Sequence, residues 1–484
     1  MKQFATIVFL TWSFSSLAQQ GRVFSIKQCM EIALTNNLTM KQNQVSVSGN
    51  EVQLRQSQMS RYPSLNANAS QSVNFGRSVN PYDNTVVADQ QVNSNNMGLS
   101  ASVNLFNGFL TKNTVQQRQL NLQASKEDVN TTKNNIILGV VDAFANVLSS
   151  KALLASARLQ FESTQAQLDK TQRMVDAGRL PQFNLLDLKA QSATEETNII
   201  IAENSLELAK LSLAQWMQID VGQVEDVTEP NLVIPESEEV PASRIYSIAE
   251  PNQPQIKAAQ NRLYSAEKGI AIAQSGFYPT LSLQGGIFTN YSSLAQRYVP
   301  GKILDNPILV PVTSFQVTDP DGNSIPVTIN QVQTTGEGSF QDLSFSDQFD
   351  NNLRKGISLN LNIPIFNGFQ SRYAVDNARL TQMSAKIQLE QQKNTLRQTI
   401  ETAATNEKAA RKRLQAVEKQ ISSLEEAYRM AEQRFNLGTM NAFDFVQTKN
   451  NLFRAKNDQA RFKYDFFIRR ALLDFYLGKE LNFN

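Results

Sequence analysis

The residue types that most often carry out enzymatic chemistry are scarce in this sequence. Its 484 residues contain no histidine and one cysteine, Cys29. Histidine is the commonest general base and metal ligand, so its absence argues against most hydrolytic chemistry and most zinc sites. Cys29 cannot form an intrachain disulfide, and its helical, apolar setting favours a small packing residue. We therefore expect no enzyme, no metal site and no cofactor.

One glycine-rich run, Gly336-Glu337-Gly338, invites comparison with phosphate-binding loops. It lacks the third glycine, the preceding buried strand and the following helix that such loops require. The 46 basic and 44 acidic residues nearly balance, so there is no broad basic field for nucleic acid. We expect neither nucleotide nor nucleic-acid binding.

The first 18 residues have the layout of a secretory signal peptide. Lys2 precedes an apolar stretch at 4–14, and small residues lead to a predicted cleavage after Ala18. Gln19 stands where a lipoprotein would need cysteine. Beyond this leader, no apolar run approaches the roughly 18 residues of a membrane-spanning helix, so any membrane span must be made of strands.

The chain is a tandem duplication. Two motifs recur in the same order: Tyr62-Pro63-Ser64-Leu65 as Tyr278-Pro279-Thr280-Leu281, and Phe106-Asn107-Gly108-Phe109 as Phe366-Asn367-Gly368-Phe369. The two copies of the second motif are 260 residues apart, and the same separation holds between Gly178 and Gly438. A rigid element of fixed length must follow the motif in each half. The first motif has an offset of only 216, so the second half contains 44 additional residues.

These landmarks predict a signal peptide at 1–18, two repeats and a linker. The first repeat, 19–220, comprises a helix at about 26–60, a β-hairpin at about 62–107, a long helix at 110–178 and a return helix at 181–218. The second repeat, 244–484, comprises a helix at about 245–276, a hairpin at about 278–367, a long helix at 370–437 and a return helix at 441–477. The extra residues form an ordered surface loop at 291–349, with a hairpin turn at Asp319-Pro320-Asp321-Gly322. The acidic, proline-containing linker occupies 221–243.

Apolar and small polar residues alternate in the predicted strands. Leu65, Ala67 and Ala69 alternate with asparagine and serine, and 99–105, 281–287 and 357–365 repeat the pattern. A soluble sandwich shows the same alternation, but so does a membrane barrel with one face to lipid and one to a wet lumen. Four strands cannot close a barrel, and open edges cannot exist in lipid. Three copies of the chain would supply twelve strands.

Both long helices carry an apolar stripe at a three-four spacing and contain no proline. The stripe residues are Val140, Phe144, Val147, Leu154, Phe161, Leu168 and Val175 in the first half, and Leu414, Val417, Ile421, Leu424, Tyr428, Ala431 and Phe435 in the second. A helix of about 67 residues spans roughly 100 Å, too long for a compact domain. Gly178 and Gly438 are predicted helix stops, Pro181 suits a first turn, and Asn441 with Asp444 resembles an N-cap.

These residues resemble the TolC-like outer-membrane efflux protein family across essentially the whole mature chain. The resemblance is carried by both Tyr-Pro motifs, by Pro364-Ile365-Phe366-Asn367-Gly368, by Gln253-Pro254-Gln255-Ile256 and by the sequences starting at Gly178 and Gly438. It implies an α+β membrane protein in the outer membrane: a trimeric 12-stranded β-barrel, four strands per protomer, continuous with a periplasmic 12-helix α-barrel. It also implies a passive conduit of a tripartite efflux or type I secretion system.

The resemblance assigns roles to residues at the two helical turns. Docking of a periplasmic adaptor, joined to an inner-membrane pump, falls on Gly178, Arg179, Leu180, Pro181, Gly438, Thr439, Met440 and Asn441. The narrow entrance of the family has acidic residues six and nine positions after the turn glycine, which here are Asn184, Asp187, Asp444 and Gln447. Trimeric symmetry would make Asp187 and Asp444 a cation-selective ring. Alternatively, Asp444 serves only its helix N-terminus and Asp187 a solvated face.

The sequence departs from the family pattern at the turns, and an alternative function remains open. Phe435 and Met440 stand where the family has the tyrosine and arginine that tether the closed entrance. A soluble or surface trimeric coiled-coil scaffold without channel activity is the alternative. It explains the long helices, but neither the amphipathic strands nor the duplication.

Overall fold

A computed structural model describes residues 22–79, 86–87, 91–229, 240–335 and 338–479. The predicted signal peptide, residues 230–239 of the predicted linker and the pair Gly336-Glu337 lie outside these residues. The chain divides into two compact units, each of which draws on both repeats. The helical unit comprises Met1–Arg55, Thr114–Ile270 and Asp376–Asn484, and the strand unit comprises Gln56–Asn113 and Ala271–Val375.

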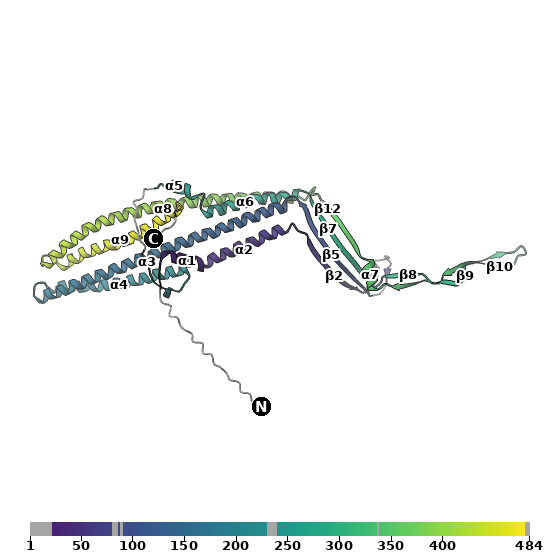
Figure 1. The fold of residues 1–484 in the computed structure, drawn as a ribbon, viewed down its shortest axis with the longest axis horizontal. Coiled ribbons are helices and arrows are strands. Elements are labelled where there is room, and N and C mark those ends of the chain that lie inside the picture. The colour runs from purple at the N-terminus through teal and green to yellow at the C-terminus, as the bar shows by residue number, and fades with distance from the viewer. Residues whose placement is uncertain (1–21, 80–85, 88–90, 230–239, 336–337, 480–484) are drawn as a thin grey trace, which may run out of the picture. The chain divides into compact units, whose positions relative to one another are not determined.

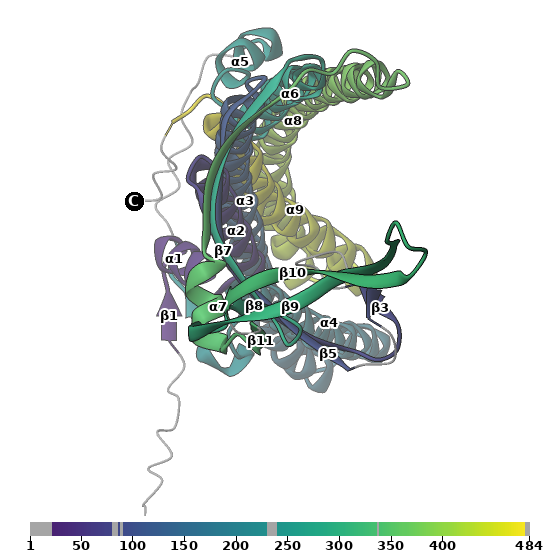
Figure 2. The same cartoon turned by 90° about the vertical axis from the view of Figure 1, so that its right-hand side faces the viewer.

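Long helices dominate the helical unit. In chain order the helices are α1 (Ile26–Asn36), α2 (Leu38–Met59), α3 (Leu110–Asp176), α4 (Gln182–Met217), α5 (Ala242–Ala249), α6 (Pro254–Gln274), α8 (Gln370–Asn436) and α9 (Ala442–Tyr476) (Figure 1). The two longest, α3 and α8, each contain 67 residues. Figure 2 shows that α3, α4, α8 and α9 form a curved layer, open on one side. A parallel pair of short strands, β1 (Arg22–Phe24) and β6 (Val224–Val227), joins the first described residues to the start of the predicted linker.

The predicted apolar stripes supply the contacts between these helices. In α8, Leu414, Val417 and Ile421 are buried in one cluster with residues of α9. In α3, Val140 and Phe144 are buried with residues of α1, α4 and β1 in another. A row of apolar side chains along each long helix therefore stabilises the layer, because burial of that surface drives helix packing.

Two helices predicted as continuous are interrupted. The expected helix at 26–60 breaks at Asn37, whose extended backbone (ψ 121°) ends α1. The Asn37 side chain accepts a hydrogen bond from the amide of Met40 at 3.1 Å and so caps the start of α2. The expected helix at 245–276 is split into α5 and α6, because a turn at 250–253 separates them and Pro254 opens α6.

The expectation that no later helix is apolar enough to cross a membrane is also corrected. Within α3, one stretch of 18 residues is apolar enough, in a helix long enough, to cross a membrane, and 44% of this stretch is buried. This helix contributes Val147 and Leu148 to the cluster that also contains Leu213 of α4. The apolar side chains of α3 thus have protein partners in the same unit.

The strand unit contains one antiparallel sheet of four strands in the order β12-β7-β5-β2. These strands are β2 (Ser64–Asn74), β5 (Val92–Asn107), β7 (Thr280–Ser292) and β12 (Arg354–Asn362), side by side in Figure 1. The register sets Leu99 beside Ala67 and Ile287, and Leu283 beside Leu359. Apolar residues therefore share one face, while Asn and Ser share the other. The outer edges of β2 and β12 have no partner strand within the described chain.

The repeated Phe-Asn-Gly-Phe motif makes the same turn in both halves. Gly108 and Phe109 have φ of 60° and 65°, and Gly368 and Phe369 have φ of 62° and 60°. A left-handed conformation is unusual for phenylalanine. The ring of Phe109 stacks edge-on against Phe106 at 5.3 Å, and the equivalent pair in the second half is 5.4 Å apart. The motif is thus a structural connector from strand to long helix.

The extra segment at 291–349 has its own secondary structure. It contains β8 (Gln296–Val299), β9 (Ile303–Thr318), β10 (Ser324–Thr335), β11 (Ser339–Asp342) and the start of α7 (Phe345–Asn351). β8 pairs with β11, and β9 pairs with β10 around the predicted turn at 319–322. The segment is therefore a two-tiered hairpin, which Figure 1 shows extending away from the four-stranded sheet.

Candidate functional site

The two turns that end α3 and α8 have the same backbone geometry. Gly178 and Gly438 adopt φ of 70° and 76°. The amide of Gly178 donates to Val175 O at 2.9 Å, and that of Arg179 to Met174 O at 2.9 Å. Gly438 and Thr439 repeat the arrangement, with donor distances of 3.0 and 2.9 Å. This pattern terminates a helix through a left-handed residue, and glycine adopts that conformation without steric cost.

The return helices that follow begin differently. Asn441 accepts a hydrogen bond from the amide of Asp444 at 2.8 Å, and its own amide nitrogen donates to Asp444 Oδ2 at 2.9 Å. The predicted N-cap is confirmed. Pro181 occupies the corresponding position before α4 and gives no side-chain cap. Only the second repeat therefore has a capped return helix.

A small hydrophobic cluster joins the turns of the two repeats. It combines Leu180 and Leu188 of the first repeat with Phe435, Ala442 and Phe445 of the second. The rings of Phe435 and Phe445 are stacked with centroids 4.8 Å apart. Among the predicted docking residues, Leu180 is thus part of a core and Met440 is half-buried against it. The other six are exposed.

The predicted entrance residues fall into two environments. Asp187, Asp444 and Gln447 are exposed on the return helices, as a pore-lining role requires. Asn184 is 3% exposed, and its Oδ1 accepts a hydrogen bond from the amide of Ala442 at 3.4 Å. Asn184 therefore connects the two return helices instead of facing solvent. The carboxylate of Asp444 also accepts a hydrogen bond from the side chain of Asn441 at the start of α9, and its role at the entrance stays a prediction.

Sequence reasoning missed an exposed aromatic pair beside the turns. Phe183 is 54% exposed and Phe443 is 67% exposed. The two occupy equivalent positions, because they are separated by the repeat offset of 260 residues. Leu186 and Leu437, near the same turns in the sequence, are also exposed. The recurrence of phenylalanine at the repeat offset, as the second residue of each return helix, was the available signal.

A buried polar network close to the turns was also missed. Lys449 on α9 is 2% exposed and Glu195 on α4 is 1% exposed, with Nζ and Oε1 4.0 Å apart. The lysine donates to Gln160 O of α3 at 3.0 Å and also to the hydroxyl of Thr164. Glu195 Oε1 accepts from Gln160 at 3.0 Å and from Gln191 at 2.8 Å. The network therefore joins α3 and α4 of the first repeat to α9 of the second.

Burial dominates the electrostatics of this network. Desolvation lowers the pKa of Lys449 to about 8, and the negative charge of Glu195 only partly opposes the change. Glu195 Oε2 has no hydrogen-bond partner in the described chain. A buried ion pair that is incompletely satisfied adds little stability but is costly to break on one side. The network is suited to fixing the register of α9 against α3 and α4.

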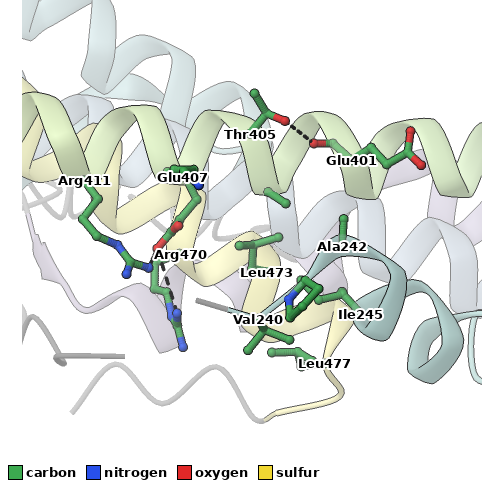
Figure 3. A pocket seen from close by; sticks show the side chains of 13 residues that line it. Val240, Ala242, Ile245, Glu401, Thr405, Glu407, Arg411, Arg470, Leu473 and Leu477 are labelled. Atoms are coloured by element: carbon green, nitrogen blue, oxygen red, sulfur yellow. Dashed lines mark hydrogen bonds and ion pairs between the residues drawn. The ribbon is translucent and has the colours of Figure 1, made fainter. Parts of the chain in front are cut away.

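A cavity of about 410 Å³ lies elsewhere in the helical unit, between α5, α8 and α9. Glu407, 3% exposed, accepts a hydrogen bond from Arg411 and lies 3.9 Å from Arg470 Nη1. Figure 3 shows these three side chains together and an apolar wall that includes Ile245 and Leu473. The charged groups in the cavity pair with one another, so we interpret the cavity as part of the packing between α5, α8 and α9 and not as a binding site. Among the described residues, no group of three or more Cys, Asp or Glu side chains is placed to hold a metal ion.

Comparison with known proteins identifies the class to which this architecture belongs. Residues 29–217 and 329–479, more than half of the chain, match the family described as outer membrane efflux protein. The chain belongs to the outer membrane efflux protein family. The two matched segments fall in the two repeats recognised from the sequence.

Individual relatives agree with this assignment. The chain is 23% identical over 396 residues to outer membrane protein TolC of Escherichia coli (strain K12), covering 80% of this chain and 70% of that protein. It is 23% identical over 462 residues to the cation efflux system protein CusC of the same strain, covering 94% and 84%. The crystal structure of the outer membrane protein VceC from Vibrio cholerae matches with a TM-score of 0.73 at 16% identity, covering 94% and 97%.

The predicted fold class and location are therefore confirmed. The protein is a TolC-like outer-membrane protein with a long periplasmic helical extension. Its fold is that of the trimeric channels in which each protomer supplies four strands to a β-barrel and its helices to an α-barrel. The tandem duplication is part of that fold.

Proposed function

We propose that the protein is the outer-membrane channel of a tripartite efflux or type I secretion system, a passive conduit for small molecules or polypeptides. The observation that carries the proposal is the four-stranded sheet. Its register puts apolar residues on one face and asparagine and serine on the other, and the outer edges of β2 and β12 have no partner strand among the described residues. Such a sheet is stable in lipid only if identical protomers complete a closed wall.

The partners in this proposal are two further copies of the chain, a periplasmic adaptor and an inner-membrane pump. The exposed turn residues, among them Arg179, Thr439 and Asn441, form the adaptor-docking surface. Phe183 and Phe443 add two exposed aromatic side chains, the type that most often anchors a protein interface. Asp187 and Asp444 form the cation-selective ring at the entrance.

Fractionation and conductance measurements test the proposal. The mature protein should be found in the outer membrane, should migrate on gels as a trimer that heating dissociates, and should form ion-conducting pores in planar bilayers. The coiled-coil scaffold alternative predicts a trimer without conductance and without enrichment in the outer membrane. A single-chain species with no conductance would refute both.

Docking at the turns requires a separate test. Phe183→Ala together with Phe443→Ala should abolish copurification of the adaptor, while the trimer and its conductance persist. Leu380→Ala and Met383→Ala, which remove exposed apolar side chains of α8 far from the turns, provide the matched control. Equal loss of the adaptor in both double variants would contradict docking at the turns.

A further inference from the structure

The hairpin of β9 and β10 has an amphipathic outer half that the described chain leaves uncovered. Among the described residues, these two strands pair only with each other. Their turn is well defined: Asp319 Oδ1 accepts from the amides of Asp321 at 3.1 Å and Asn323 at 2.7 Å, and Gly322 has φ of 87°. An isolated two-stranded hairpin is marginally stable in water, so this element requires a covering partner.

The register of the hairpin divides its outer half into two faces. Val317 lies opposite Ile325, and Phe315 lies opposite Val327. The side chains between them, on the other face, are Ser314, Gln316, Thr318, Ser324, Pro326 and Thr328. The apolar face comprises Phe315, Val317, Ile325, Val327 and Ile329, which are 36–52% exposed and include no charged residue. A contiguous apolar surface of this kind marks a contact site.

Lipid is not available to cover this face. β7 contains 13 residues, which rise about 44 Å and so cross the roughly 30 Å hydrocarbon core even when tilted. The hairpin follows β7 and β8, at the strand ends that do not lead into the helices. The end of β7 is held by Gln348 of α7, whose amide group bonds to Ser292 N and O at 2.9 and 3.0 Å. The extra segment therefore leaves the sheet from a fixed point at the end of β7, and the β8–β11 pair separates this point from the hairpin.

Symmetry supplies the partner. The hairpin is inserted between β7 and β12, and β12 is an edge strand that a neighbouring protomer must pair to close the barrel. Each trimer therefore carries three identical hairpins at the rim of one barrel. Their apolar faces contain no charges, so these faces do not repel one another at close range.

We propose that the apolar faces of the three β9–β10 hairpins pack against one another around the threefold axis and form an apolar constriction at the outer mouth of the channel. The polar faces, with Gln316 and Thr328, then contact water. This inference rests on the proposed trimeric channel and adds an interaction surface and a second narrow point to it. An apolar constriction restricts ion flow because water leaves it readily.

Cysteine cross-linking tests the contact. Phe315→Cys and Val327→Cys should each give covalent dimers when the trimer is oxidised, because three thiols near one axis form one disulfide and leave one thiol. Gln316→Cys and Thr328→Cys, one position away on the polar face, should remain monomeric on denaturing gels. Cys29 does not interfere, since it is fully buried and burial raises the pKa of its thiol to about 12.

Conductance tests the constriction. Val327→Asp should raise single-channel conductance several-fold, because three carboxylates near one axis repel and hydrate, whereas Thr328→Asp should leave it unchanged. The inference is overturned if conducting trimers form but the apolar-face cysteines give no dimers, or cross-link instead to another protein. Absence of trimers and of conductance in the unsubstituted protein would refute the proposed function itself. If Val327→Asp fails to assemble into trimers, the cysteine variants still test whether the apolar faces of the hairpins contact one another.

Discussion

Lys189 and Lys449 occupy equivalent positions on the return helices of the two repeats, yet only Lys449 is buried. The helices around them are nearly the same length, with 36 residues in α4 and 35 in α9. They differ in their neighbours: Lys449 meets Glu195, Gln160 and Thr164, all from the first repeat. A duplication can therefore preserve the length of an element while assigning different physical roles to matching residues.

The largest expected effect comes from removing the buried lysine. Lys449→Met should destabilise the turn end of α9 by about 3–5 kcal/mol, because methionine, unlike a charged or a neutral lysine, cannot donate to Gln160 O and the Thr164 hydroxyl and leaves Glu195 without a polar partner on α9. Lys189→Met, at the exposed equivalent, should change stability by less than about 0.5 kcal/mol. Hydrogen-exchange protection of amides in α4 and α9 measures both.

A second substitution sharpens this result. Adding Glu195→Gln to Lys449→Met should recover most of the lost protection, since the glutamine oxygen still accepts from Gln160 and Gln191 and the uncompensated charge is gone. Equal losses in the two lysine variants would show that the burial of Lys449 has no energetic consequence.

The next effect is a dependence on pH. The pKa of Lys449 falls from 10.5 to about 8 in the folded protein. Between these values the unfolded chain binds more protons, so the stability of the α9 turn should rise as pH increases, by roughly 3 kcal/mol in total. Hydrogen exchange corrected for intrinsic rates, compared at pH 7.5 and pH 10, measures the change. This rise of stability with pH should be absent in Lys449→Met and present in Lys189→Met.

The helix starts provide a smaller contrast. Asn441→Ala should cost about 1 kcal/mol in the first turn of α9, because the amide of Asp444 loses its acceptor. Pro181→Ala should cost less at α4, since Pro181 gives no side-chain cap. Hydrogen exchange of the amides in the first turns of α4 and α9 measures the two losses separately. Comparable losses would mean that the cap does not distinguish the repeats.

The smallest effect on stability is expected at the two aspartates. Asp187→Asn and Asp444→Asn together should weaken block of the channel by multivalent cations in bilayer recordings, because both side chains are exposed and three copies would face one axis. The single variants show whether both repeats contribute. Unchanged block in the double variant would remove the ring assignment.

The helices illustrate how far sequence reasoning reached. Local patterns predicted the long helices, the glycine stops and the Asn441 cap, because period, turn conformation and capping are properties of short segments. The interruption at Asn37 escaped prediction, since an asparagine inside a polar helix carries no breaker signal comparable to proline. The burial of Asn184 escaped as well, because it depends on the amide of Ala442, a residue 258 positions away.

The sequence by itself determined the duplication, the alternation of the strands and the lengths of the rods, since each is encoded by spacing along one segment. Only the tertiary structure decided which lysine is buried and which polar side chains join the repeats. It also decided that the apolar face of the β9–β10 hairpin is exposed among the described residues. These outcomes depend on surfaces brought together from distant segments. Burial and charge compensation are properties of such contacts, so equivalent residues in the two repeats can differ.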